Sequence, residues 1–235
     1  MKTFKQKGGP FKERPYFDLQ DIEQICADEL RALNLLPSDP APIRIERFIE
    51  KRFGVSPVYE ELPEGVLGYS EFGAKGVKAV VIARALAEDE STAAARRVST
   101  TLAHEAGHGL LHAYLFALGA PQRGIFGSEV TEPKILCRTV PLSGVATGQN
   151  KYGGQWWEFQ ANQAIGALLL PRQLVGKAVK AMLTPVGSLE VAHSLPTENR
   201  EKAATLVADV FDVNRVVARI RLQELYPVDR GQLTL

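Results

Sequence analysis

The chain has 235 residues, of which 45% are hydrophobic, and a formal net charge of +1 at pH 7. This length allows one domain with a substantial core, and the balanced charge gives no general attraction to nucleic acid or to an anionic membrane. The sequence has no apolar stretch near the roughly 20 residues that span a bilayer, and its Lys-rich start lacks the apolar core of a signal peptide. Cys26 and Cys137 fit reduced thiols better than a disulfide framework, so we expect a cytoplasmic protein without a membrane partner.

The first part of the chain predicts an arm followed by two packing helices. Residues 1–16 are basic and contain Gly and Pro, so we interpret them as a flexible basic arm. The remainder, 17–235, is expected to form a single domain. Apolar residues recur at helical spacing over 22–35, and a Pro-containing link leads to a second expected helix at 45–53.

Three short strands are expected next, separated by turns that contain Gly or Pro. They are predicted at 55–61, 65–72 and 77–84. The last of these is strongly apolar, which indicates a sheet with a covered face. The expected fold class is therefore α+β, mostly helical, with a small three-stranded antiparallel sheet next to the helix that follows.

That helix, expected over 92–112, contains the sequence HEAGH. His104 and His108 are four residues apart, so they lie on one face of a helix and can share one zinc ion. Glu105, between them, is then the general base. The alternative is a surface helix whose histidines meet by chance, but three of the four histidines of the chain fall between positions 104 and 112. This clustering favours the metal site.

Two histidines leave a catalytic zinc site one protein ligand short, because such a site takes three protein ligands and a water. Glu158 lies near the start of another predicted helix, which stops at Pro171, and Asn162 lies four residues later on the same face. We predict that Glu158 binds the metal and that the Asn162 amide orients a ligating imidazole. Without the HEAGH helix, Glu158 would be interpreted as a solvated first-turn glutamate favoured by the helix dipole.

The residues between these two helices, 113–152, form a long insert with Gly, Pro, Thr and Ser throughout. Long loops in compact domains tend to be functional, so we predict a lid or a substrate wall. Arg138 and Tyr152 in the insert, and His193 beyond it, are candidate donors to the transition state. His112 is interpreted as a structural or site-edge residue, because a third imidazole one turn further along the helix suits a tetrahedral site poorly.

The C-terminal part, 173–235, is expected to be helical and supports a second functional hypothesis. Residues 204–219 have the cadence of a helix-turn-helix, with Arg215 and Arg219 on the recognition-like helix, as in a DNA-binding regulator. In the competing interpretation these helices close the core, and both arginines together with Arg221 are solvated. The net charge of only +1 favours that interpretation, because DNA-binding proteins usually carry an excess of basic residues.

Two motifs together resemble the ImmA/IrrE family of zinc metallopeptidases. They are RVSTTLAHEAGHGLLH at 97–112, and EFQAN at 158–162 followed by ALLLP at 167–171. The similarity also includes the expected helix near 42–49 and the tail at 211–222, so it covers about residues 20 to 225.

The resemblance implies a zincin-like fold and a zinc-dependent endopeptidase, often one that inactivates a DNA-binding repressor. It assigns His104, His108 and Glu158 as Zn²⁺ ligands and Glu105 as the base, and it implies a protein substrate such as a helix-turn-helix repressor. The chain departs from the family in its long insert and at Gln160, where glutamate is frequent. A metal-dependent sensor with little turnover would share every ligand, so this third hypothesis stays open.

Overall fold

The computed structural model describes residues 2–5, 13–73, 75–114, 134–138, 156–186 and 192–227. The helices are α1 (Leu19–Ala32), α2 (Ile45–Phe53), α3 (Arg84–Glu88), α4 (Thr92–Leu111), α7 (Trp156–Leu169), α8 (Arg172–Val179), α9 (Arg200–Val210) and α10 (Arg215–Leu225). The strands are β1 (Lys2–Lys5), β2 (Glu13–Tyr16), β3 (Val58–Glu60), β4 (Val66–Gly73), β5 (Gly76–Ala83), β6 (Lys134–Arg138), β7 (Thr184–Val186) and β8 (Ala192–Ser194). Short 3-10 turns lie at Lys180–Met182 and Thr197–Asn199. The predicted α+β class with mostly helical content is confirmed.

Local sequence signals account for the ends of the first two helices. The Asp18 side chain accepts a hydrogen bond from the Asp21 backbone N–H at 2.8 Å, which starts α1 three residues before the predicted position. Gly54 ends α2 in the left-handed conformation, with φ of 73°, which glycine adopts without steric cost. The expected helix at 45–53 is confirmed to the residue.

The main sheet differs from the prediction in direction and in strand number. The described strands are ordered β3-β5-β4-β6, and β3 runs parallel to β5 while the other pairs are antiparallel. The prediction of an all-antiparallel, three-stranded sheet was therefore wrong. Because β4 and β5 pair directly as a hairpin, each keeps one free edge, and β3 joins at the free edge of β5 with the same direction as that strand. β6, from the predicted insert, adds on the other side of β4.

The predicted arm also contains paired strands. β1 and β2 form an antiparallel pair in which Lys2 lies opposite Tyr16. Sequence analysis expected a flexible segment here because of its Gly, Pro and basic residues. The β-forming residues Thr3, Phe4 and Tyr16 are the local feature that favours strands instead.

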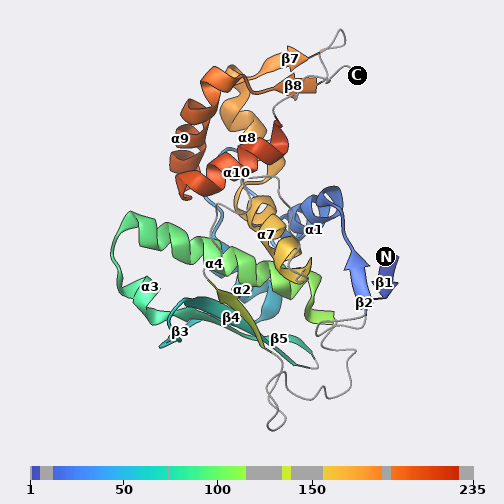
Figure 1. The fold of residues 1–235 in the computed structure, drawn as a ribbon, viewed down its shortest axis with the longest axis vertical. Helices are drawn as coiled ribbons and strands as arrows, with labels where there is room; N and C mark the ends of the chain where they lie inside the picture. The colour runs from blue at the N-terminus through green and yellow to red at the C-terminus, as the bar shows by residue number, and fades with distance from the viewer. Residues whose placement is uncertain are drawn as a thin grey trace, which may run out of the picture.

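Helix α4 lies between the sheet on one side and α7 on the other (Figure 1). The close approach of the two helices depends on Gly107, where an added Cβ would lie 2.8 Å from the Ala164 Cβ and 3.2 Å from the Ala161 Cα. Because both sides of α4 are covered, its residues from Thr101 to Gly109 are buried, including the charged and polar ones of HEAGH. The fold therefore places this motif in the interior.

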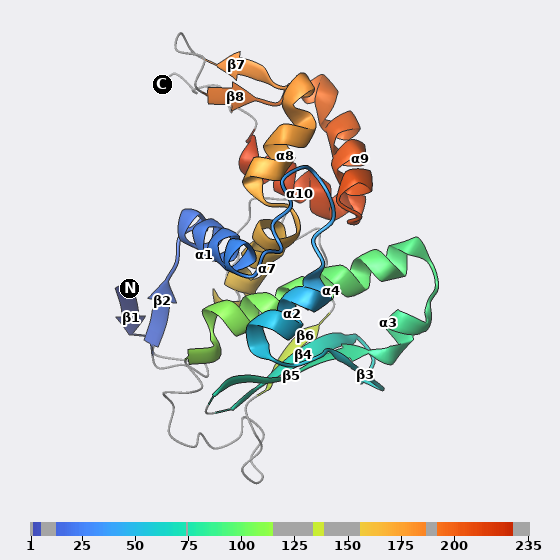
Figure 2. The ribbon, with the colours of Figure 1, turned by 180° about the vertical axis from the view of Figure 1, so that it is seen from behind.

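The C-terminal helices α8, α9 and α10 and the β7–β8 pair form the end of the molecule opposite the main sheet (Figure 2). Apolar residues of α8 to α10 join those of α1, α2, α4 and α7 in one hydrophobic cluster. None of the helices in the described segments combines the length and apolar character needed to cross a bilayer.

Candidate metal centre

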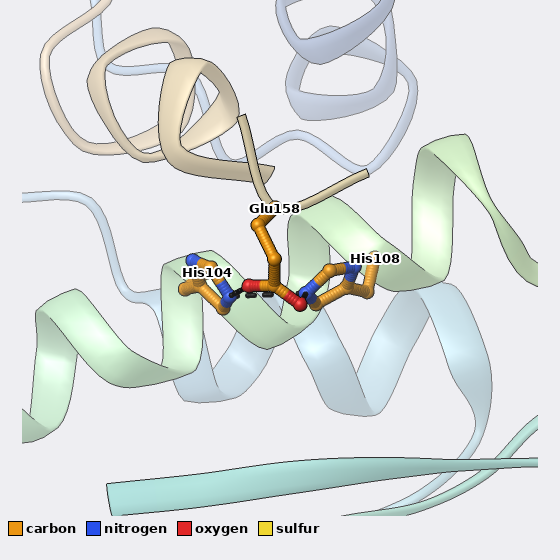
Figure 3. A group of neighbouring side chains, drawn as sticks. All are labelled: His104, His108 and Glu158. Carbon is orange, nitrogen blue, oxygen red and sulfur yellow. Dashed lines mark hydrogen bonds and ion pairs between the residues drawn. The ribbon is translucent and has the colours of Figure 1, made fainter. Parts of the chain in front are cut away.

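The side chains of His104, His108 and Glu158 converge on one point between α4 and α7 (Figure 3). One nitrogen or oxygen atom from each residue can be chosen so that all lie within 4.8 Å of one another. The two Nε2 atoms are 3.0 Å apart. Glu158 Oε2 lies 3.1 Å from His104 Nε2, and Glu158 Oε1 lies 3.6 Å from His108 Nε2. These three residues could hold a metal ion.

Helix geometry explains the convergence. His104 and His108 are one helical turn apart on α4, so their rings project from the same face. Glu158 lies in the first turn of α7, and the small side chains near Gly107 let that helix come close enough for the carboxylate to reach both rings. The sequence predicted this trio from the spacing of the histidines and the need for a third ligand, and the structure brings its members together.

Asn162 contacts the outer nitrogen of one of these rings. Its Oδ1 lies 3.0 Å from His104 Nδ1. An amide oxygen only accepts hydrogen bonds, so this contact places the proton of a neutral His104 on Nδ1 and leaves the Nε2 lone pair for a metal. The structure thus places Asn162 where the prediction of an orienting residue requires it.

His112 lies directly behind His108 and outside the ligand trio. Its Nδ1 is 3.0 Å from His108 Nδ1, and its Nε2 is 3.0 Å from Gln160 Oε1. All three side chains are buried. Gln160 therefore faces His112 and not the convergence point, which removes position 160 as an alternative to Glu158. No spacing within one helix predicts the contact between His112 and Gln160, because it depends on how α4 and α7 pack.

The electrostatics of the trio suit a divalent cation. Burial would raise the pKa of the Glu158 carboxyl, but hydrogen bonds and charges from His104 and His108 together bring it well below its usual range. Burial lowers the pKa of His108 and, more strongly, that of His112. An ionised carboxylate and neutral imidazoles are the protonation states in which these groups bind metals.

Glu105 lies on the side of α4 that faces the sheet, and it is fully buried. Its Oε2 accepts a hydrogen bond of 2.6 Å from the hydroxyl of Ser70 on β4. Its Oε1 is buried without a hydrogen-bond partner among the described residues. Burial is the main cause that raises the pKa of Glu105 to about 7. Ser70 was not predicted from the sequence, because nothing local distinguishes it from other polar strand residues.

The three predicted transition-state donors have different positions. His193 is exposed in β8, in the strand pair at the opposite end of the molecule from the main sheet (Figure 1), so the structure does not bring it to the trio. Arg138 ends β6, next to β4, and its side chain lies outside what the structure describes. Tyr152 and most of the insert 113–152 are outside the described residues as well.

The predicted helix-turn-helix segment forms α9 and α10, but its arginines are engaged within the protein. Arg215 donates to Glu201 at 3.0 Å, and Arg219 donates to both oxygens of the same carboxylate at 2.8 and 2.7 Å. Arg221 is buried and donates to the Leu170 carbonyl at 2.9 Å, so the interpretation of Arg221 as solvated was wrong. These contacts weaken the basic face that DNA binding requires.

No family model, curated protein or solved structure matches this chain. The site can therefore be interpreted only from the chemistry of its own side chains, His104, His108 and Glu158. Two imidazole nitrogens and one carboxylate fit the three protein ligands of a catalytic zinc site, and the outer contacts of both rings leave their facing nitrogens able to bind. The residues present fit a zinc ion.

Proposed function

We propose that the protein is a zinc-dependent endopeptidase with a zincin-like arrangement, similar to the ImmA/IrrE metallopeptidases. The observation that carries this proposal is the convergence of His104, His108 and Glu158, together with a buried Glu105 carboxylate that lies close enough to His104 and Glu158 for their charges to affect its pKa. A general base next to three ligands is the arrangement used for metal-assisted hydrolysis. The proposed substrate is a cytoplasmic protein, such as a helix-turn-helix repressor.

The chain supplies an oriented base and a set of ligands. His104, His108 and Glu158 would hold Zn²⁺, and zinc bound there would make a water molecule more acidic and polarise the scissile carbonyl. Ser70 holds Glu105 Oε2 by its hydrogen bond, which leaves Oε1 to accept the proton of the attacking water. Glu105 then donates that proton to the nitrogen of the leaving amine.

The main sheet sets where an extended peptide could bind. β4, the strand that carries Ser70, is paired on both sides, with β5 and with β6. In the part of the chain that the structure describes, β6 is the outermost strand on that side. A substrate that adds to the sheet there would therefore pair with β6 through backbone hydrogen bonds.

The test compares zinc-loaded wild-type protein with Glu105→Gln on casein and on a helix-turn-helix repressor, with intact-mass analysis. We expect wild type to produce discrete fragments and Glu105→Gln to lose at least about 100-fold in turnover, because general acid–base catalysis contributes that much. Both proteins should bind one zinc, because Glu105 is not a ligand. Wild-type turnover by Glu105→Gln would remove Glu105 as the base. A zinc-loaded wild type without cleavage of either substrate would favour the metal-dependent sensor.

A further inference from the structure

We infer that His112 and Gln160 form a hydrogen-bond relay that sets which nitrogen of His108 carries the proton, and thereby how tightly the site binds zinc. This inference rests on the proposed metal site. It assigns His112 and Gln160 as positioning residues, since neither belongs to the group of converging ligand atoms.

The direction of each hydrogen bond follows from the metal. His108 can bind zinc through Nε2 only if its proton lies on Nδ1, which faces His112 Nδ1 at 3.0 Å. His112 Nδ1 must then accept, so the proton of a neutral His112 lies on Nε2. That nitrogen donates to Gln160 Oε1, which is 3.0 Å away. With these directions, each of the two hydrogen bonds of the relay has one donor and one acceptor, and His108 Nε2 is left free of a proton.

The Gln160 amide selects between this arrangement and its reverse. If the amide turned over, its NH₂ group would donate to His112 Nε2, and the proton of His112 would move to Nδ1. His108 Nδ1 would then accept, and its Nε2 would carry a proton toward the metal position. The reversed relay is therefore incompatible with zinc binding, and the oxygen of Gln160 favours the competent tautomer.

The surroundings hold the relay in place. His112 is fully buried, and its ring packs edge-on against Trp156, with ring centroids 5.5 Å apart and planes at 77°. Gln160 is 2% exposed, so water competes little for its amide. His104 has a simpler counterpart, since the Asn162 oxygen contacts its Nδ1 directly. An amide oxygen from α7 thus lies behind each histidine ligand, once directly and once through His112.

The experiment measures zinc affinity by chelator competition in the full-length protein, with the absorption spectrum of the Co²⁺ form as a second readout of coordination. We expect Gln160→Leu and His112→Leu to weaken zinc binding by about 10- to 100-fold, the usual effect of removing such partners. Gln160→Glu should bind at least as tightly as wild type, because a carboxylate can only accept. His112→Asn should recover most of the affinity, because its amide oxygen comes close to the position of Nδ1.

The matched control is Gln163→Leu, which removes the same side chain from α7 at a position where it hydrogen-bonds to Glu224. It should leave zinc affinity and the Co²⁺ spectrum unchanged. Wild-type affinity in both leucine variants at 112 and 160 would overturn the relay while the zinc site stands. A wild-type protein that binds no zinc would overturn both proposals. Should His112→Leu fail to fold, equal affinities of Gln160→Glu and Gln160→Leu would by themselves overturn the relay.

Discussion

At the residue scale, the site is organised by the groups that contact the ligands and the base. Glu105 is held from β4 by Ser70, His104 from α7 by Asn162, and His108 through His112. Each of these buried contacts either sets which ring nitrogen of a histidine carries the proton or holds a carboxylate oxygen of Glu105 in place. Buried hydrogen bonds of this kind impose a single geometry, because an unmade bond costs the full desolvation of the polar group.

The Ser70 hydroxyl should affect the base and not the metal. Replacing Ser70 with Ala removes the 2.6 Å hydrogen bond to Glu105 Oε2 and leaves the carboxylate less well oriented. A hydrogen bond to a charged group is worth about 1.5 to 3 kcal/mol, so we expect turnover to fall by roughly 10- to 100-fold. Zinc affinity, measured by chelator competition, should match wild type. A parallel loss of zinc binding would contradict the assignment of Ser70 to Glu105.

Site residues could be predicted from the sequence where metal binding itself requires a particular residue spacing. The four-residue interval of the histidines and the need for a third ligand were sufficient to predict the trio that the structure brings together. The same reasoning did not find Ser70 or Gln160. Their contacts with Glu105 and His112 join different elements, so no spacing within one helix or strand encodes them.

At the element scale, the approach of α4 and α7 determines whether the ligands meet. Ala161 and Ala164 of α7 lie against Gly107 of α4, so the helices contact each other there through small residues. Glu158 is one turn before Ala161, and its carboxylate can reach both histidines only if this spacing is kept. Gly107, which lies between the two histidines, thus allows the close helix contact that the three ligands need in order to meet.

Adding a methyl group at Gly107 should push the helices apart. The new Cβ would lie 2.8 Å from the Ala164 Cβ and 3.2 Å from backbone atoms of Ala161. Overpacking costs on the order of 1 to 3 kcal/mol, against a gain of about 1 kcal/mol in helix propensity. We expect Gly107→Ala to lower the free energy of unfolding by roughly 1 kcal/mol and also to weaken zinc binding, as measured by urea unfolding and chelator competition.

The control for this variant is Gly73→Ala, because an added Cβ at Gly73 meets no atom within 4 Å. It should change neither stability nor zinc affinity appreciably. Unchanged zinc affinity in Gly107→Ala would show that the distance between α4 and α7 does not limit metal binding.

Element prediction from the sequence depended on whether the signal was local. Apolar residues at helical spacing predicted α1, the Pro-containing link predicted where α2 begins, and turns with Gly or Pro separated the strands predicted at β3 to β5. The parallel pairing of β3 with β5 and the addition of β6 were not predictable in this way, because strand order depends on contacts between distant segments. β6 was not predicted within the long insert, because it becomes part of the sheet only through its pairing with the distant strand β4.

At the scale of the whole molecule, Arg221 joins the C-terminal helices to the rest. It extends from α10, donates to the Leu170 carbonyl at 2.9 Å, and forms an ion pair of 2.5 Å with Glu23 of α1. Its Nη1 also lies 3.4 Å from Glu224. Only 1% of the Arg221 side chain is exposed, so Nε and Nη1 exchange water for these protein partners, while Nη2 is buried without a hydrogen-bond partner among the described residues.

Removing this arginine should destabilise the protein strongly. Arg221→Ala removes the closest cation from the largely buried carboxylates of Glu23 and Glu224, and leaves Glu23 only the longer 3.9 Å contact with Arg172. Breaking a buried pair costs about 3 to 5 kcal/mol. Urea unfolding provides the measurement. The control is Arg219→Ala on the same helix, where a half-exposed arginine pairs with an exposed Glu201, and its loss should be much smaller. Equal losses in the two variants would contradict the linking role of Arg221.

The most direct measurement of the central claim is anomalous diffraction from a zinc-loaded crystal, recorded on both sides of the zinc absorption edge. We predict an anomalous peak in contact with His104 Nε2, His108 Nε2 and the Glu158 carboxylate, present only above the edge. A zinc-loaded protein whose anomalous peak lies elsewhere, or which shows no peak between these three side chains, would contradict the metal centre and the peptidase built on it.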